Sequence, residues 1–330
     1  MNTLDHTTPV LTTGSILKGA TTNYIVENMI NEGRYGRTYL AIVQSTGQKV
    51  AIKQLAPENG NLYTYSDSIQ DMASEPSGRF GFDTEVKFLQ SIDSPHVIKV
   101  LERIDEGCPS YVNAMYVLEY IDGISLNDYI AKTGAMDERK ALAVLHAVTK
   151  GVRSIHEAGM VHLDIKTSNI MIGKDGRVCL IDFDTLKPHL DSHIRIGTQG
   201  YMPVECASDY GKDLLPTPMD IYSLGATLLK MLTGQNPPLA EDIAIKGLPF
   251  DLLKNHQVSD KVIGLIGKCM AVKWKERVQT ASELLNLIET IIGTATTAPL
   301  DDVETVMNQA LVTEDIKNDG ITIEKADPRT

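Results

Sequence analysis

The sequence has few cysteines, and their spacing predicts neither a metal site nor a disulfide framework. The four are far apart, at Cys108, Cys179, Cys206 and Cys269, and no two of them form a Cys-x-x-Cys pair. Zinc modules and disulfide-stapled secreted proteins depend on close, regular cysteine spacing. We therefore expect reduced thiols and an intracellular protein.

The chain also lacks long apolar runs and an excess of positive charge. No run reaches the ~18 apolar residues of a membrane span, and the N-terminus has neither a basic start nor an apolar stretch. With 31 Lys and Arg against 43 Asp and Glu, the formal net charge is −12. This balance argues against nucleic acid or an anionic membrane as the main partner. We expect a cytoplasmic protein without a membrane span and without a nucleic-acid partner.

The most informative residues that are present form two short motifs, His-Leu-Asp-Ile-Lys-Thr-Ser-Asn at 162–169 and Ile-Asp-Phe-Asp at 181–184. The first offers an Asp that can accept a hydroxyl proton, a Lys two residues on and an Asn five residues on. The second offers another carboxylate. Such a set can assemble around a nucleotide phosphate and its Mg²⁺, which points to phosphoryl transfer.

The apolar residues between these motifs predict how they meet. Residues 170–172 and 178–181 read as two strands, joined by a glycine-bracketed turn at 173–176. This hairpin would bring Asn169 beside Asp182. Both are oxygen ligands, which suits Mg²⁺. Either residue alone would read as a turn cap, but their occurrence at this separation favours a metal site.

The two motifs resemble the His-Arg-Asp-x-Lys-x-x-Asn loop and the Asp-Phe-Gly motif of eukaryotic-like Ser/Thr protein kinases, and the resemblance covers about residues 24–292. It implies that Asp164 is the catalytic base and that Lys166 contacts the γ-phosphate. It also implies that Asn169 and Asp182 bind the metal. A Lys two residues after the base is typical of kinases that act on Ser and Thr.

Two departures from the family pattern stand out. Leu163 takes the place of the Arg before the catalytic Asp, and Asp184 takes the place of the glycine in Asp-Phe-Gly. The chain therefore resembles a non-RD, DFD variant of a soluble bacterial form. A histidine at position 162, close to the expected catalytic Asp, suggests acid–base chemistry. The resemblance implies instead that the ring of His162 packs against Phe183, with Leu89 and Val100 nearby.

Upstream, three strands are expected at residues 23–30, 37–44 and 48–55. The connection between the first two resembles the family's glycine-rich loop, which would lie over the phosphates of ATP. Its nucleotide-binding residues would be Asn31, Gly33, Gly36 and Thr38, with Asn31 in place of the first glycine and Thr38 in place of a valine.

The third strand carries Val-Ala-Ile-Lys, a full match to the family's strand motif that places Ala51 and Lys53 in the nucleotide site. Lys53 needs an anionic partner. Glu85 is the candidate, because it lies in a helical pattern at residues 82–90. Glu75 competes for this role but lies in a polar stretch that contains Pro and Gly.

Two further segments fit the same family. Residues 115–120 resemble the strand and hinge that hold adenine, with Leu118 as gatekeeper and Glu119 and Tyr120 in the hinge. Residues 197–205 resemble the segment that receives a protein substrate. The resemblance also implies that Glu205 of that segment pairs with Arg277, which sits where the family has a buried Arg. A buried charge without a partner is costly.

The sequence thus predicts an α+β, two-lobed protein kinase fold, with a small β-rich N-lobe and a mainly helical C-lobe. The predicted domain division is a polar tail at 1–22, a kinase domain at 23–292 and an acidic tail at 293–330 that we expect to be disordered. Within the domain we expect the N-lobe at 23–118, the hinge at 119–123 and the C-lobe at 124–292. Residues 57–81 read as a surface loop.

The implied function is transfer of the γ-phosphoryl group from ATP, with Mg²⁺, to Ser or Thr of protein substrates. A protein with a phosphothreonine-binding domain is a further candidate partner, because both tails contain threonines. Two alternatives stay open. A small-molecule kinase of the aminoglycoside or choline type shares the catalytic-loop spacing, and Asn31, Leu163 and Asp184 suggest a pseudokinase scaffold. Against these stand the protein-substrate segment and the presence of the residues expected to contact phosphate and metal.

Overall fold

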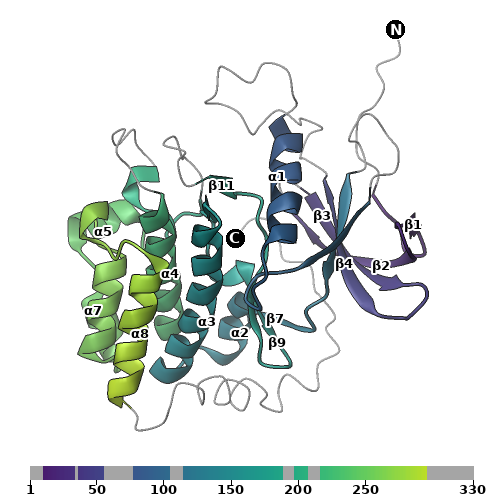
Figure 1. The fold of residues 1–330 in the computed structure, drawn as a ribbon. Helices are drawn as coiled ribbons and strands as arrows, with labels where there is room; N and C mark the ends of the chain where they lie inside the picture. Colours follow the sequence, from purple (N-terminus) through teal and green to yellow (C-terminus); the bar gives the residue numbers. More distant parts are fainter. Residues whose placement is uncertain are drawn as a thin grey trace.

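The computed structural model describes residues 10–33, 36–55, 77–104, 114–188, 197–206 and 216–295. They form two lobes, one built on a twisted antiparallel sheet and the other on helices (Figure 1). The predicted α+β two-lobed architecture is confirmed.

The N-lobe sheet has six strands in the order β1-β2-β3-β4-β6-β5. The strands are β1 Ile16–Lys18, β2 Asn23–Glu32, β3 Gly36–Val43, β4 Lys49–Leu55, β5 Val100–Ile104 and β6 Met115–Glu119. All neighbouring strands are antiparallel. One face of the sheet buries Tyr39, Ile52 and Val117 in the core of this lobe, and helix α1, Ser77–Ser91, packs beside β5.

Two features of this lobe differ from the expectation. Strand β1 lies inside the segment predicted to be a tail, and it pairs with β2 while burying Leu17. Helix α1 begins at Ser77, so Ser77–Gly81 is helical rather than part of the loop predicted at 57–81. Gly78 and Gly81 suggested a loop, but a glycine in a helix costs only about 1 kcal/mol relative to alanine and is tolerated. Residues 57–76 lie outside the described residues. So do residues 1–9 of the tail predicted at 1–22 and residues 296–330 of the tail predicted at 293–330, whereas helix α8 continues to Ala295.

A second sheet lies at the junction of the lobes, with strands in the order β10-β9-β7. Strands β9, Ile170–Gly173, and β10, Val178–Leu180, form the predicted hairpin. Strand β7, Gly123–Ser125, pairs with β9, and a Cβ at Gly123 would collide with the backbone carbonyl of Ile172. Glycine is therefore required where the chain enters the C-lobe. Strands β8, Met160–Val161, and β11, Lys187–Pro188, make a short third sheet.

The C-lobe is built around helix α4, most of whose residues are buried. Its helices are α2 Leu126–Thr133, α3 Glu138–Glu157, α4 Thr217–Thr233, α5 Ala240–Lys246, α6 Phe250–Asn255, α7 Asp260–Cys269 and α8 Ala281–Ala295. Single 3-10 turns lie at Thr167–Asn169, Val204–Cys206 and Trp274–Glu276. Helices α3, α7 and α8 pack on α4.

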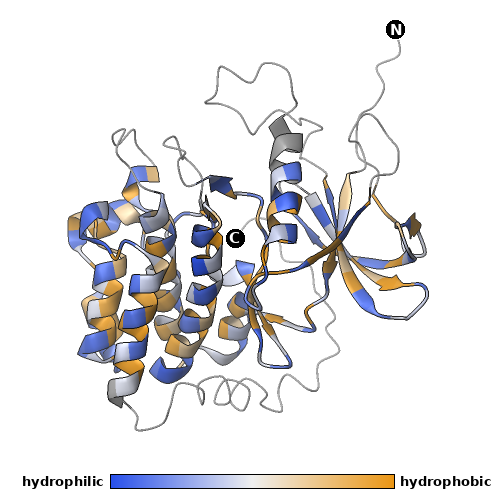
Figure 2. Ribbon diagram, in the orientation of Figure 1, coloured by the Kyte–Doolittle hydropathy of each residue, from blue (hydrophilic) through white to orange (hydrophobic). Residues whose placement is uncertain are grey.

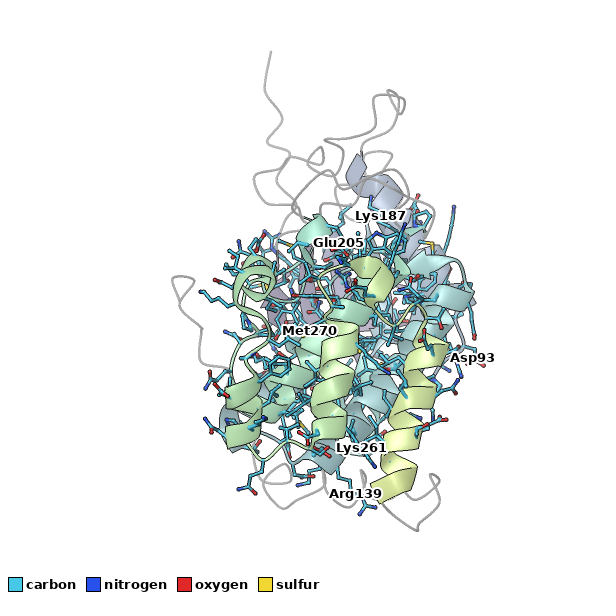
Figure 3. All side chains as sticks on the ribbon, turned by 90° about the vertical axis from the view of Figure 1, so that its left-hand side faces the viewer. Asp93, Arg139, Lys187, Glu205, Lys261 and Met270 are labelled. Carbon is cyan, nitrogen blue, oxygen red and sulfur yellow. The ribbon has the colours of Figure 1, made fainter. Side chains whose placement is uncertain are left out.

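Hydropathy follows this packing. Apolar residues line the inner faces of the C-lobe helices, and hydrophilic residues cover their outer faces (Figure 2). In the view of Figure 3, Glu205 and Lys261 lie toward opposite ends of the face formed by the C-lobe helices. No helix within the described ranges is long and apolar enough to cross a membrane.

Candidate active site

A cleft of about 630 Å³ lies between the lobes, and every residue predicted for the site lines it. From the N-lobe and hinge these are Asn31, Gly33, Gly36, Thr38, Ala51, Lys53, Glu85, Leu118, Glu119 and Tyr120. From the C-lobe they are Asp164, Lys166, Asn169 and Asp182. The fold therefore brings together residues that are up to 151 positions apart, from Asn31 to Asp182.

Lys53 lies at the centre of a cluster of carboxylates. Its Nζ is 3.1 Å from Glu85 Oε1, 3.1 Å from Asp182 Oδ1 and 2.6 Å from Asp184 Oδ1. Strand β4 points Lys53 toward α1, so the predicted pair with Glu85 forms. Tyr116 OH donates to Glu85 Oε1 at 2.6 Å and holds this carboxylate from the neighbouring strand β6. Glu75, the competing partner, lies outside the described residues.

Burial and the charges of its neighbours shift the pKa of each ionisable group in this cluster. Burial alone would lower the pKa of Lys53, but the carboxylates of Asp184 and Glu85 raise it well above its usual value. Partial burial would raise the pKa of Asp182, but Lys53 lowers it to about 2. Burial and the charge of Asp182 raise the pKa of Asp184, although Lys53 opposes them. Like charges that share a site cannot ionise equally well.

Asp164 is held by three donors. Thr198 Oγ1 donates to its Oδ1 at 2.6 Å, and Lys166 Nζ and Asn169 Nδ2 donate to its Oδ2 at 2.7 and 3.1 Å. Lys166 also donates to Thr198 Oγ1 at 2.9 Å. These contacts fix the orientation of the carboxylate with respect to the cleft.

Asp220 holds the backbone that immediately precedes Asp164. The buried Asp220 carboxylate accepts the N–H groups of His162 and Leu163 at 2.9 and 2.8 Å, and it accepts from His156 Nε2 at 2.9 Å. Burial would raise the pKa of Asp220, but the hydrogen bond from His156 and the charge of that ring lower it. The loop at 162–169, which is predicted to be catalytic, is thus attached to the central helix of the lobe.

The residues predicted to hold a metal fit a hard cation. Asn169 ends the 162–169 loop, and its amide nitrogen donates to Asp164 O at 2.9 Å. Its Oδ1, which accepts from Ser168 Oγ at 3.3 Å, is the side-chain atom that could also bind a metal. Asp182 has a φ of 65°, in the left-handed region, and its side chain is 40% exposed. Oxygen donors of this kind suit Mg²⁺ completed by phosphate oxygens and water. The described residues contain no group of three or more His, Cys, Asp or Glu arranged to hold a metal.

His162 packs as the resemblance implied. Its ring centroid is 4.8 Å from that of Phe183, and Phe183 is 6.2 Å from Phe88. Leu89 belongs to the same core as Phe183, and Val100 packs against that core. Burial lowers the pKa of His162, and its Nε2 has no hydrogen-bond partner within the described ranges. A neutral, packed ring is the consistent interpretation.

The hinge end of the cleft contains an ion pair that the sequence did not predict. Arg177 reaches from the β9–β10 hairpin and donates from both terminal nitrogens to Glu119, at 3.0 and 2.6 Å. Glu119 Oε1 also accepts from the backbone N–H of Lys99 at 3.0 Å.

Leu118, the predicted gatekeeper, pairs with Ala51 across β4 and β6. Leu118 and Ala51, both predicted to contact the nucleotide, therefore lie opposite each other on neighbouring strands.

Residues 197–205, the segment expected to receive a protein substrate, are bonded to the C-lobe core. Tyr201 OH is 3.2 Å from Thr167 Oγ1 in the catalytic loop. Arg277 forms a bidentate pair with Glu205, contacts Glu205 Oε2 at 2.9 Å, and lies over the Tyr222 ring. The predicted pairing of Glu205 with Arg277 is confirmed.

Comparison with known proteins agrees with this geometry. The protein kinase domain family matches residues 24–287, so the chain belongs to the protein kinase family. Its similarity to bacterial kinases confirms the eukaryotic-like, bacterial-type form that the motifs indicated. It is 28% identical over 244 residues to the serine/threonine-protein kinase PknB of Mycolicibacterium smegmatis, an alignment that covers 69% of this chain and 39% of that protein.

Two other relatives extend the comparison. The chain is 30% identical over 221 residues to the serine/threonine-protein kinase drp72 of Corynebacterium efficiens, which covers 65% of this chain and 39% of that protein. Among solved structures it resembles the apo form of PpkA-294, with a TM-score of 0.67 and 23% identity over 85% of this chain and 99% of that one. This last likeness supports the fold. The chain spans about 39% of the length of the curated relatives named here.

Leu163 predicts how the segment between Asp182 and Glu205, the activation segment that kinases phosphorylate, is controlled. Its side chain is 4% exposed and packs with Val161, Cys206 and Met219 in an apolar cluster, so it offers no cation to a phosphorylated segment. We therefore expect complete dephosphorylation to change the specific activity by less than about tenfold, or 1.4 kcal/mol in the barrier. The measurement is activity before and after phosphatase treatment, with phosphate removal checked by mass spectrometry. A loss of tenfold or more would contradict this expectation.

Proposed function

We propose that this protein is a Ser/Thr protein kinase, which transfers the γ-phosphoryl group of ATP to Ser or Thr hydroxyls of protein substrates. The observation that carries the proposal is the meeting in one cleft of the Lys53–Glu85 pair with Asp164, held in place by Thr198, Lys166 and Asn169. Phosphoryl transfer depends mainly on positioning and on charge stabilisation, and this arrangement supplies both.

The roles follow from position. Lys53 would bind the α- and β-phosphates, with Glu85 fixing its ammonium and Tyr116 fixing Glu85. Asp164 would accept the proton of the acceptor hydroxyl while the oxygen bonds to the γ-phosphorus and the bond to the bridging oxygen breaks, releasing ADP. Lys166 would contact the transferred group.

Mg²⁺ is the cation that the donor set fits best, and Asn169 and Asp182 would hold it. When bound, it would neutralise charge on the phosphate oxygens. Adenine would lie between Ala51 and the hinge residues Glu119 and Tyr120, beside the gatekeeper Leu118. Asn31, Gly33, Gly36 and Thr38 would cover the phosphates.

Three features favour a protein substrate over a small molecule. The relatives named above are described as serine/threonine-protein kinases, Tyr201 is bonded to the catalytic loop, and Glu205 is fixed by Arg277. The proposal includes a cytoplasmic location. It also includes a partner whose phosphothreonine-binding domain would recognise phosphorylated threonines of the tails. Residues 1–9 and 296–330 of these tails lie outside the described residues.

Incubation of the protein with radiolabelled ATP and Mg²⁺ tests the class of reaction. One arm contains a generic basic protein, one contains only the kinase, and one contains aminoglycosides and choline. We expect label on protein in the first two arms. Label on the small molecules would favour the small-molecule kinase, and the absence of transfer in all three arms would favour a pseudokinase.

A further inference from the structure

Asp184 makes the shortest of the three carboxylate contacts to Lys53. Its Oδ1 lies 2.6 Å from Lys53 Nζ, whereas Glu85 and Asp182 each lie at 3.1 Å. Its side chain is 22% exposed and lines the cleft. A carboxylate at this position therefore faces the space that the nucleotide phosphates would enter, on the same side as Asp182.

The backbone holds the two aspartates in a fixed relation. Phe183 between them is 1% exposed and packs against His162 and Phe88. Because the central side chain is anchored in the core, both flanking carboxylates are directed at the same ammonium. Asp182 Oδ1 and Asp184 Oδ1 lie 3.1 and 2.6 Å from the same Lys53 Nζ.

This cluster holds more carboxylates than one lysine can neutralise. Phosphates that approach Lys53 must compete with Glu85, Asp182 and Asp184 for its N–H groups, and they bring further negative charge. Repulsion between like charges is strong in a partly buried site. A divalent cation removes that repulsion, because it is the largest local charge and binds carboxylate and phosphate oxygens together.

We propose that Asp184 is an additional oxygen ligand for the divalent cations that accompany the nucleotide. It therefore makes nucleotide affinity depend more steeply on the cation than Asn169 and Asp182 alone would. The inference rests on the proposed function, since it assumes that a nucleotide binds in this cleft. A purely structural role predicts something different, namely that Asp184 only anchors Lys53 and supports nucleotide binding equally with and without metal.

The test is binding, without turnover. The dissociation constant of a non-hydrolysable ATP analogue is measured by calorimetry across a Mg²⁺ series that begins in chelator, for the parent, Asp184→Asn and Asp184→Glu. We expect the gain in affinity from Mg²⁺ to be smaller in Asp184→Asn by about tenfold or more. Analogue binding without metal should be equal or tighter in that variant, and Asp184→Glu should recover part of the Mg²⁺ dependence. Asp93→Asn is the matched control, because this carboxylate is exposed and pairs only with Lys99 among the contacts observed in the described ranges.

A second readout follows the metal itself. Free Mn²⁺ is counted by electron paramagnetic resonance in the presence of the analogue, and we expect Asp184→Asn to bind Mn²⁺ more weakly than the parent. Equal Mg²⁺ dependence in parent and Asp184→Asn would overturn the proposal, and so would an equal loss of affinity with and without metal. If the parent bound no nucleotide under any condition, the proposed function would fail as well, so the two failures can be told apart.

Discussion

Replacing Asp164 by alanine is expected to reduce phosphoryl transfer by a factor on the order of 10³ while the protein stays folded. The structure gives the reason. Thr198, Lys166 and Asn169 hold this carboxylate in one orientation at the cleft, and no neighbouring residue of the catalytic loop offers a second carboxylate in its place. The measurement is initial rate of label transfer to protein, together with the melting temperature.

A matched control separates catalysis from folding. Asp251→Ala removes an exposed carboxylate from the first turn of α6, and we expect it to leave the rate unchanged. Asp164→Asn keeps the shape of the side chain but removes the base, so it should lose nearly as much activity as Asp164→Ala. Near-normal turnover in either Asp164 variant would mean that the base lies elsewhere.

The second large effect concerns stability. Arg277→Ala should destabilise the protein by about 3–5 kcal/mol, because it leaves the buried carboxylate of Glu205 without its partner. Arg277 is fully buried and Glu205 nearly so, and Arg277 also donates to the carbonyl of Ala271 at 2.8 Å. Urea unfolding followed by the fluorescence of the single tryptophan, Trp274, reports on this region directly.

The double variant Glu205→Leu with Arg277→Met tests the cause. It removes both charges and fills the space with apolar atoms, so it should be less destabilised than Arg277→Ala. Lys254→Ala, an exposed cation on α6, should have little effect on the unfolding midpoint. If Arg277→Ala unfolded at the parent's urea concentration, the buried pair would not stabilise the fold as the structure indicates.

Sequence alone predicted the residues of the site because they lie in short motifs with a defined spacing. The hairpin of β9 and β10 is local, so the meeting of Asn169 and Asp182 could be expected from the turn between the strands. Lys53 and Glu85 are 32 residues apart, and their pairing was predicted from the resemblance to a known family.

Contacts between distant side chains could not be predicted in the same way. Arg177 reaches Glu119 over 58 positions, and Asp184 reaches Lys53 over 131. These contacts depend on how the hairpin and the two lobes pack. Strand β1 was not predicted, because its three residues are too few to show the alternation of apolar and polar residues that identifies a strand. Local pattern determines the elements, and tertiary packing determines which charged side chains meet.

The central claim is that the γ-phosphoryl group of ATP is transferred to Ser or Thr hydroxyls of protein in this cleft. The most direct measurement uses ATP labelled with ¹⁸O in its γ-phosphate, followed by mass spectrometry of the protein products. The account predicts phosphoserine and phosphothreonine that carry the heavy oxygens with the parent, and about a thousandfold less of them with Asp164→Ala. Heavy oxygen found only in inorganic phosphate, or equally on protein incubated with Asp164→Ala, would contradict it.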